Sequence, residues 1–329
     1  MIISSAPGRA GIVGNPSDMY GGSVVSCTVP CRACCTIAAA DRFTLEVNGE
    51  YEEINSIDDL RLSGNRFDIP KAVTSSLEIN PAKCRFSMTI TSDIPEQAGL
   101  AGSTAMVVAV VGCITEFLEM GLNRYEIAEM SRKIESEVMG ILCGFQDQYM
   151  AAFGGLNYLD FREKEGLVQL QEEPYATVEP LTAFVPELPI ILAHTGIKRN
   201  SGTVHRSIRE RWEDGEEAVV QGYTRIAHLA RLAKKALLSG RMDELAQLMN
   251  ENHAIQRDLG GSGPVNEALI EAALANGAIG AKLAGAGRGG TIAALTLDPE
   301  RTARALEEAG ADRILPVEPT EGLVIERTD

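Results

Sequence analysis

A run of small residues at positions 99–105 lies between a strand-like segment and a long apolar helix. Residues 86–92 alternate apolar and polar side chains, as half-buried strands do, and residues 106–120 are largely apolar and contain no proline. The run therefore opens a helix. It consists of Gly99, Leu100, Ala101, Gly102, Ser103, Thr104 and Ala105.

Such a loop has the chemistry of a phosphate site. Small residues let a ligand approach the backbone closely, and the free N–H groups at the start of a helix favour anions. The Ser103 hydroxyl can reach a phosphate-bound Mg²⁺. Serine and threonine are also ordinary helix caps, so the loop alone leaves a purely structural interpretation open. The chain contains no Gly-Lys pair, which disfavours a Walker-type P-loop.

Two further glycine-rich segments lie near the ends of the chain. Residues 6–22 place the cation Arg9 and the polar residues Asn15 and Asp18 in a turn-rich stretch, and residues 282–291 contain Gly285 and Gly287. The second segment also matches GxGxxG, the dinucleotide pattern. We expect a helix before it and a strand after it, which is the reverse of the order in a dinucleotide site.

A block with two candidate catalytic carboxylates occupies residues 135–148. A capping box of Asn123 and Glu126 predicts a helix before it, with apolar side chains along one stripe. Glu135 lies at the edge of this stripe, and Asp147 follows a Cys-Gly pair. Simpler interpretations are a surface carboxylate for Glu135 and a helix cap for Asp147.

The three glycine-rich segments and the 135–148 block, in this order, resemble the motifs of the GHMP kinases. That family is named for galactokinase, homoserine kinase, mevalonate kinase and phosphomevalonate kinase, and the resemblance runs from Pro7 to Thr291. It implies an ATP-dependent sugar kinase with Mg²⁺ as a cofactor. It also implies that ATP contacts the 99–105 loop together with Gly285 and Gly287.

The resemblance also assigns roles to the polar residues. Asp147 would accept the proton of the attacking hydroxyl, and Ser103 and Glu135 would hold Mg²⁺. Arg9 would stabilise the charge that develops during transfer. These roles agree with what phosphoryl transfer requires, namely an aligned nucleophile, a metal on the phosphates and a nearby cation.

The first glycine-rich segment, residues 6–22, bears on which acceptor molecule is phosphorylated. Gly-Asn-Pro at residues 14–16 stands where galactokinase and mevalonate kinase have Gly-Glu-His, which disfavours galactose and mevalonate. The same segment, the central loop and residues 201–212 resemble glucuronokinases, which phosphorylate the anomeric hydroxyl of glucuronate. Asn15, Asp18 and Arg206 would then contact the sugar. The alternatives are another GHMP sugar kinase, acting on a heptose phosphate, galactose or another sugar, and a non-catalytic sensor of sugar and ATP.

Charge is unevenly distributed along the chain. Lysine and arginine number 30 against 46 aspartates and glutamates, a net charge of −16 that disfavours nucleic acid as a partner. One short stretch is nevertheless cationic, with Lys198, Arg199, His205, Arg206, Arg209 and Arg211. It could hold a carboxylate or a phosphate, or it could be a solvated helix face. We expect a small-molecule sugar and ATP as partners and leave a homodimer open.

The sequence favours a cytoplasmic protein. No apolar run approaches the roughly 20 residues of a membrane span, and residues 1–5 lack the basic start of a secretory signal. The seven cysteines lie mostly in apolar stretches without the spacing of a zinc site, so we expect reduced thiols.

The order of the expected elements is that of an α+β protein with two domains. Strands predominate up to about residue 68, and helices follow at 70–77, at 106–120 and after residue 123. A new strand is expected at 190–195, helices from 204 to 250 and a terminal strand at 322–325. We place the domain boundary near Leu181, giving an ATP-binding N-terminal domain of residues 1–180 and a C-terminal domain of residues 181–329. The resemblance implies a ribosomal protein S5 domain 2-like fold for the first and a ferredoxin-like fold for the second.

Overall fold

A 17-residue strand, β2 (Ser23–Ala39), organises the larger of two sheets. It pairs antiparallel along nearly its whole length with β1 (Ile2–Val13), from Ile2 opposite Ile37 to Val13 opposite Val25. Its other edge is shared, since residues 23–27 pair with β6 and residues 33–39 pair with β5. The described residues are 1–164, 173–197, 208–285, 287 and 289–328 of this computed structural model.

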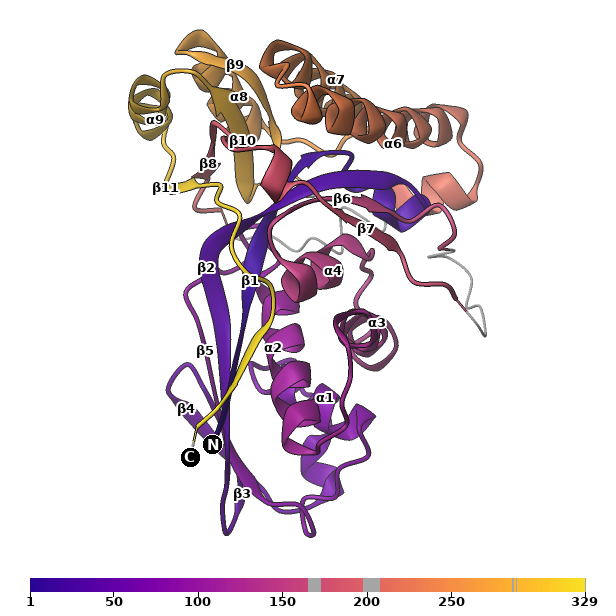
Figure 1. The fold of residues 1–329 in the computed structure, drawn as a ribbon, viewed down its shortest axis with the longest axis vertical. Helices are drawn as coiled ribbons and strands as arrows, with labels where there is room; N and C mark the ends of the chain where they lie inside the picture. The colour runs from indigo at the N-terminus through magenta and orange to yellow at the C-terminus, as the bar shows by residue number, and fades with distance from the viewer. Residues whose placement is uncertain (165–172, 198–207, 286, 288, 329) are drawn as a thin grey trace.

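The larger sheet has the strand order β12-β1-β2-β5-β3-β4, with β6 on β2 and β7 on β6. The end of the chain returns to this sheet, because β12 pairs antiparallel with β1 and places Arg327 opposite Ile2. Figure 1 accordingly shows the two termini side by side. The remaining strands are β3 (Phe43–Val47), β4 (Glu50–Ile54), β5 (Phe86–Ser92), β6 (Leu156–Asp160), β7 (Thr177–Pro180) and β12 (Val324–Arg327).

Four helices lie along one face of the larger sheet (Figure 1). They are α1 (Asp68–Ser76), α2 (Gly102–Phe117), α3 (Arg124–Lys133) and α4 (Gln146–Phe153). The centre of α2 is buried on all sides, which accounts for its nearly unbroken apolar sequence. The predicted capping box of α3 is confirmed: Asn123 Oδ1 accepts from the backbone N–H of Glu126 at 3.1 Å, and Glu126 Oε2 accepts from the N–H of Asn123 at 2.7 Å.

The smaller sheet is antiparallel, with the order β11-β8-β10-β9. Its strands are β8 (Ile190–His194), β9 (Ala278–Leu283), β10 (Thr291–Thr296) and β11 (Arg313–Pro316). In Figure 1, α8 and α9 lie beside this sheet and α6 and α7 run above the upper end of β1 and β2. These helices are α6 (Glu217–Leu238), α7 (Met242–Asp258), α8 (Pro264–Ala275) and α9 (Pro299–Glu308).

The GxGxxG segment joins β9 to β10, which are antiparallel neighbours, so it is not a dinucleotide fingerprint. The helix expected before the loop, at residues 267–276, is confirmed as α8, and β9, which was not predicted, lies between α8 and the loop. Residues 278–283 are rich in alanine and glycine and have little strand propensity of their own. They become a strand through pairing with β10.

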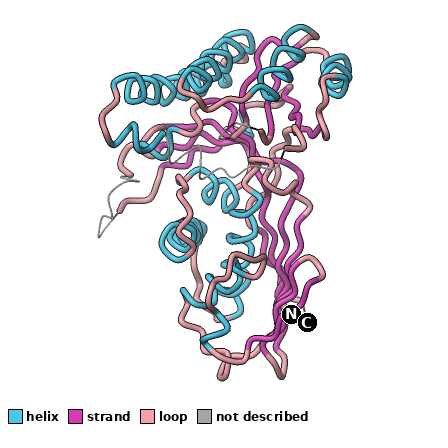
Figure 2. The backbone as a smooth tube through the Cα atoms, turned by 180° about the vertical axis from the view of Figure 1, so that it is seen from behind, coloured by secondary structure: helices cyan, strands magenta, loops and turns pink. Residues whose placement is uncertain are grey.

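The predicted α+β fold is otherwise confirmed in its main elements. The strand at 86–92 is β5, and the helix expected to open at the small-residue run is α2, which begins at Gly102, so that the last four residues of the run form its first turn. None of the described helices is both long and apolar enough to cross a membrane. All seven cysteines are free thiols. Figure 2, the view from behind, shows the long strands of the larger sheet running beside the helices.

Candidate active site

The three glycine-rich segments meet at one place in the fold. The first is the upper part of β1, the second leads into α2, and the third joins β9 to β10. Three hydrogen bonds link them pairwise, from Arg9 N–H to Leu100 O at 3.0 Å, from Gly11 N–H to Ala284 O at 3.0 Å and from the Thr291 hydroxyl to Ala98 O at 2.8 Å. Backbone groups from distant parts of the chain therefore hold the loops in a fixed arrangement.

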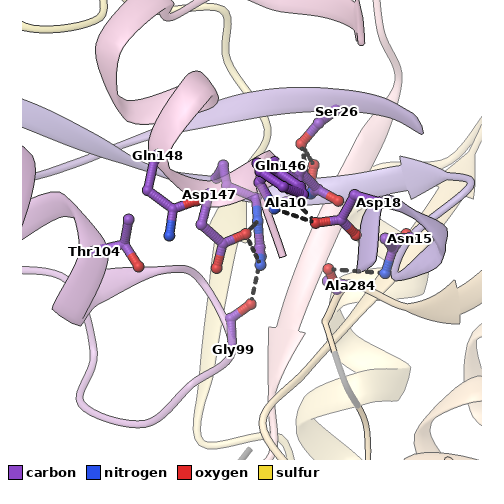
Figure 3. Close-up of polar contacts among 12 residues, drawn as sticks. Ala10, Asn15, Asp18, Ser26, Gly99, Thr104, Gln146, Asp147, Gln148 and Ala284 are labelled. Atoms are coloured by element: carbon purple, nitrogen blue, oxygen red, sulfur yellow. Dashed lines mark hydrogen bonds and ion pairs between the residues drawn. The ribbon is translucent and has the colours of Figure 1, made fainter. Parts of the chain in front are cut away.

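Arg9 and Asp147 form an ion pair at this junction. Arg9 Nε donates to Asp147 Oδ1 at 2.8 Å and Nη2 lies 2.6 Å from the same oxygen. Arg9 Nη1 donates to Gly99 O at 2.7 Å, so one guanidinium ties the carboxylate to the central loop (Figure 3). The arginine side chain is 10% exposed and that of Asp147 is 31% exposed, which leaves the carboxylate open to a ligand.

The central loop has the backbone form of a cradle. Gly99 has φ of 77° and Ala101, the residue before α2, has φ of 60°, so the chain turns sharply into the helix. Ser103, in the first turn, is exposed, whereas Thr104 is buried. The loop thus combines the backbone N–H groups at the start of a helix with the exposed hydroxyl of Ser103. This arrangement suits an anion.

Glu135 is a buried carboxylate behind this loop. The Thr104 hydroxyl donates to its Oε1 at 2.8 Å, and Gln148 Nε2 donates to its Oε2 at 2.6 Å. Burial raises the pKa of Glu135 to about 7, an effect that these hydrogen bonds oppose. The other amide atom of Gln148, Oε1, is buried and has no hydrogen-bond partner among the described residues.

Asp18 holds the start of α4. Its Oδ2 accepts from the N–H groups of Phe145 and Gln146 at 2.9 and 3.0 Å, satisfying donors at the helix start. Burial raises the pKa of Asp18. Gly144 is required here because a Cβ on it would lie 2.0 Å from Asp18 Oδ2. Asp18 therefore fixes the helix that carries Asp147.

Asn15 contacts a lysine that the sequence did not single out. Lys282 Nζ, at the end of β9, donates to Asn15 Oδ1 at 2.7 Å and also to the carbonyl of Leu283. Lys282 is fully buried, and burial together with the charge of Arg9 lowers its pKa to about 7. A neutral amine has two N–H donors, and these two acceptors match them.

Only part of the cationic stretch lies within the described residues. Lys198, Arg199, His205 and Arg206, which include one predicted sugar contact, lie outside the described residues. Arg209 pairs with Glu213 at 2.7 Å and Arg211 with Glu216 at 2.6 Å. Within the described ranges, no group of three histidine, cysteine, aspartate or glutamate side chains is placed to hold a metal ion.

Two site residues were missed by sequence reasoning. Gln148 directly follows Asp147 in the chain, and the sequence analysis gave it no role. Its position next to a candidate catalytic base was a signal that could have identified it. Lys282 is the one charged residue in an otherwise uncharged strand, β9, directly before a glycine loop. An unexplained charge in a buried strand normally has a partner, and this signal could have found it.

Comparison with known proteins matches both halves of the chain to one family. A family model described as the GHMP kinases N terminal domain matches residues 69–155, and one described as GHMP kinases C terminal matches residues 233–312. A mevalonate kinase of Pyrococcus abyssi is 34% identical over 262 residues, covering 78% of this chain and 73% of that protein. Glucuronokinase 1 of Arabidopsis thaliana is 27% identical over 320 residues, covering 91% and 86%.

A solved structure covers the whole chain. It is a D-glycero-D-manno-heptose 1-phosphate kinase from Bacteriodes thetaiotaomicron, with a TM-score of 0.77 and 25% identity over 100% of both chains. Relatives with different acceptors therefore lie at similar levels of identity.

Proposed function

The chain belongs to the GHMP kinase family of ATP-dependent kinases, and from that premise we propose that it phosphorylates a hydroxyl of an acidic sugar. The first candidate is the anomeric hydroxyl of a uronic acid. The observation that carries the proposal is the Arg9–Asp147 pair at the junction of the three glycine-rich segments. It brings a carboxylate and a cation to the loop suited to a triphosphate.

In this proposal the residues have distinct roles. Asp147 orients or deprotonates the attacking hydroxyl, which then displaces ADP from the γ-phosphate. Arg9 stabilises charge on the transferring group. The 99–105 loop, with Gly285 and Gly287, surrounds the phosphates. Asn15 and Asp18 shape the acceptor side, since one adjoins Lys282 and the other fixes the start of α4.

The donor atoms near the loop suit Mg²⁺. Ser103 offers an exposed hydroxyl and Glu135 a carboxylate, and both are the oxygen ligands that Mg²⁺ prefers. The unpartnered Gln148 Oε1 is a further oxygen beside Glu135. We propose that Ser103 and Glu135 hold the metal and that Thr104 and Gln148 orient the carboxylate. When bound, Mg²⁺ neutralises charge on the phosphates.

A sugar phosphate is the second candidate acceptor. The full-length similarity to a heptose 1-phosphate kinase favours it, because that relative carries a phosphate in its named substrate class. A phosphate and a carboxylate are both anions that arginine recognises.

The test is ³¹P NMR of the purified chain with MgATP and a panel of acceptors. The panel contains glucuronate, galacturonate, glucose, galactose, mannose, heptose 7-phosphate and mevalonate. We expect a new anomeric phosphate signal with a uronic acid. A signal only with a neutral sugar or mevalonate would discard the acidic-sugar acceptor, and ATP binding without phosphorylation of any compound would favour a sensor.

A further inference from the structure

A cavity of about 430 Å³ opens beside the proposed catalytic carboxylates. Its walls come from the end of α3, from the backbone of residues 140–142 and from the helical residues 208–213, and they include Arg132, Cys143 and Arg209. The volume lies within the range of small-molecule sites. Nothing in the roles proposed above uses this cavity.

One wall of the cavity, at Cys143, belongs to the same 135–148 block as the two candidate carboxylates. Burial raises the pKa of Cys143, and the negative charges of Glu135, Asp147 and Asp18 raise it further. These carboxylates therefore lie within electrostatic range of the Cys143 wall. Arg132 is in turn close enough to Glu135 to lower the pKa of that carboxyl. Gly144, the next residue after the Cys143 wall, lies against the Asp18 carboxylate, and the chain continues from there into α4, which carries Asp147.

Arg132 is a cation held in place without a counter-ion. Its guanidinium carbon lies 4.1 Å from the centre of the fully buried Phe145 ring, and this cation–π contact fixes the side chain. Its Nε is buried and has no hydrogen-bond partner, and among the described residues no carboxylate lies within ion-pair distance of it. Arg209, by contrast, is paired with Glu213.

An unpartnered buried N–H is costly unless a ligand supplies the acceptor. Guanidinium recognises carboxylate and phosphate groups through paired hydrogen bonds. The lining of the cavity also includes Glu210 and Glu213, whose oxygens can accept hydrogen bonds from sugar hydroxyls. The cavity thus offers a cation for an anionic group and acceptors for hydroxyls.

We infer that Arg132 binds the anionic group of the acceptor sugar in this cavity, with Arg209 on the facing wall. The inference deepens the proposed function and rests on it. A carboxylate of a uronic acid and a phosphate of a sugar phosphate share the required chemistry, and the binding experiment separates them. Arg132 would then select acidic over neutral sugars.

The experiment measures binding of glucuronate, glucose 6-phosphate and glucose to the full chain by fluorescence of Trp212, the one tryptophan, which packs at 4.4 Å from Tyr20. Calorimetry provides an independent readout. The variant Arg132→Met removes the charge but keeps an apolar stem on Phe145. The matched control is Lys133→Met, which removes the same charge from the neighbouring residue, whose side chain is 70% exposed.

We expect the wild-type protein to bind one of the anionic sugars more tightly than glucose. Arg132→Met should lower the affinity for that anionic sugar roughly 10- to 100-fold, while the affinity for glucose stays within about twofold of the wild-type value. Lys133→Met should change neither. Two results would overturn the inference. One is an equal loss of affinity for glucose and for the anionic sugars in Arg132→Met, and the other is a wild-type protein that binds no anionic sugar more tightly than glucose.

Two further comparisons keep the result interpretable. Arg132→Lys, which retains the charge, should keep a preference for the anionic sugar even if Arg132→Met folds poorly. Binding is read without turnover, so a failure of the kinase proposal appears separately, as ATP binding with no phosphorylated product. The preferred anion identifies the group, carboxylate or phosphate.

Discussion

Arg9 Nη2 lies 2.6 Å from Asp147 Oδ1, and the same guanidinium donates to Gly99 O at 2.7 Å. Arg9 and Asp147 are 138 positions apart in the sequence, and the side chain of Arg9 joins them and also contacts the 99–105 loop. A carboxylate paired in this way is held in one orientation. Two predictions follow from this geometry.

Asp147→Asn should lower turnover by roughly 10²- to 10⁴-fold while MgATP binding is retained. The amide keeps the shape of the side chain but can no longer accept the hydroxyl proton. Turnover is measured with the acceptor identified by NMR, and ATP affinity by calorimetry. Asp160→Asn is a suitable control, because Asp160 is ion-paired to Arg162 at the end of β6. Unchanged turnover in Asp147→Asn would remove this residue from the mechanism.

Arg9→Met should lower turnover roughly 10²- to 10³-fold, because it removes a cation next to the transferring group. Since Arg9 also positions Asp147, the double variant Arg9→Met/Asp147→Asn should lose less than the product of the single effects. Arg32→Met is the control, since Arg32 donates to Ser5 and to backbone carbonyls and should affect stability more than turnover. Strictly multiplicative effects of Arg9 and Asp147 would argue that they act independently.

The sequence was sufficient to single out Arg9, Glu135 and Asp147 as candidate site residues, because each is a charged side chain in or near a glycine-rich segment or a capped helix. The structure brings Arg9 and Asp147 together at the 99–105 loop, and the roles of these residues stay predictions. The sequence could not reveal that Lys282 reaches Asn15. These residues are 267 positions apart, and their contact depends on how the end of β9 packs against the end of β1. Such long-range pairing has no local signature.

One strand, β9, has no local signal in the sequence that would predict it. Residues 278–283 contain two alanines and a glycine, and only the neighbouring β10 makes them a strand. By contrast, the capping box at Asn123 was predictable, since all of its hydrogen bonds lie within four residues. Local interactions could therefore be predicted from the sequence, and tertiary interactions could not.

Thr104→Val should destabilise the protein by about 1–3 kcal/mol, because it removes a buried hydroxyl that donates to the Glu135 carboxylate. It should also raise the Mg²⁺ concentration needed for half-maximal turnover, since Glu135 loses a positioning partner. Both are measured directly, by denaturant unfolding and by Mg²⁺ titration. The matched control is Thr74→Val, because the buried Thr74 hydroxyl has no partner among the described residues. An equal loss of stability in the two variants would contradict the prediction.

Lys282 should make stability depend on pH. Burial and the charge of Arg9 lower its pKa from 10.5 to about 7, so between these values the unfolded chain binds more protons than the folded one. The free energy of unfolding contributed by Lys282 therefore rises with pH above about 7 and is lost as pH falls through 7. The slope is at most about 1.4 kcal/mol per pH unit, the limit for a single proton.

Lys282→Met should remove this slope. The comparison is made by urea unfolding between pH 7 and pH 8, at least one unit below the ordinary thiol pKa of 9.0, and the cysteine contribution is the same in both chains, so it cancels in the difference between them. His253 also feels the charge of Lys282, but burial lowers its pKa below the ordinary 6.5, so it titrates beneath this window. Lys71→Met, which removes a lysine paired with Glu52, should leave the slope in place. A slope that persists in Lys282→Met would mean that another group carries the proton difference.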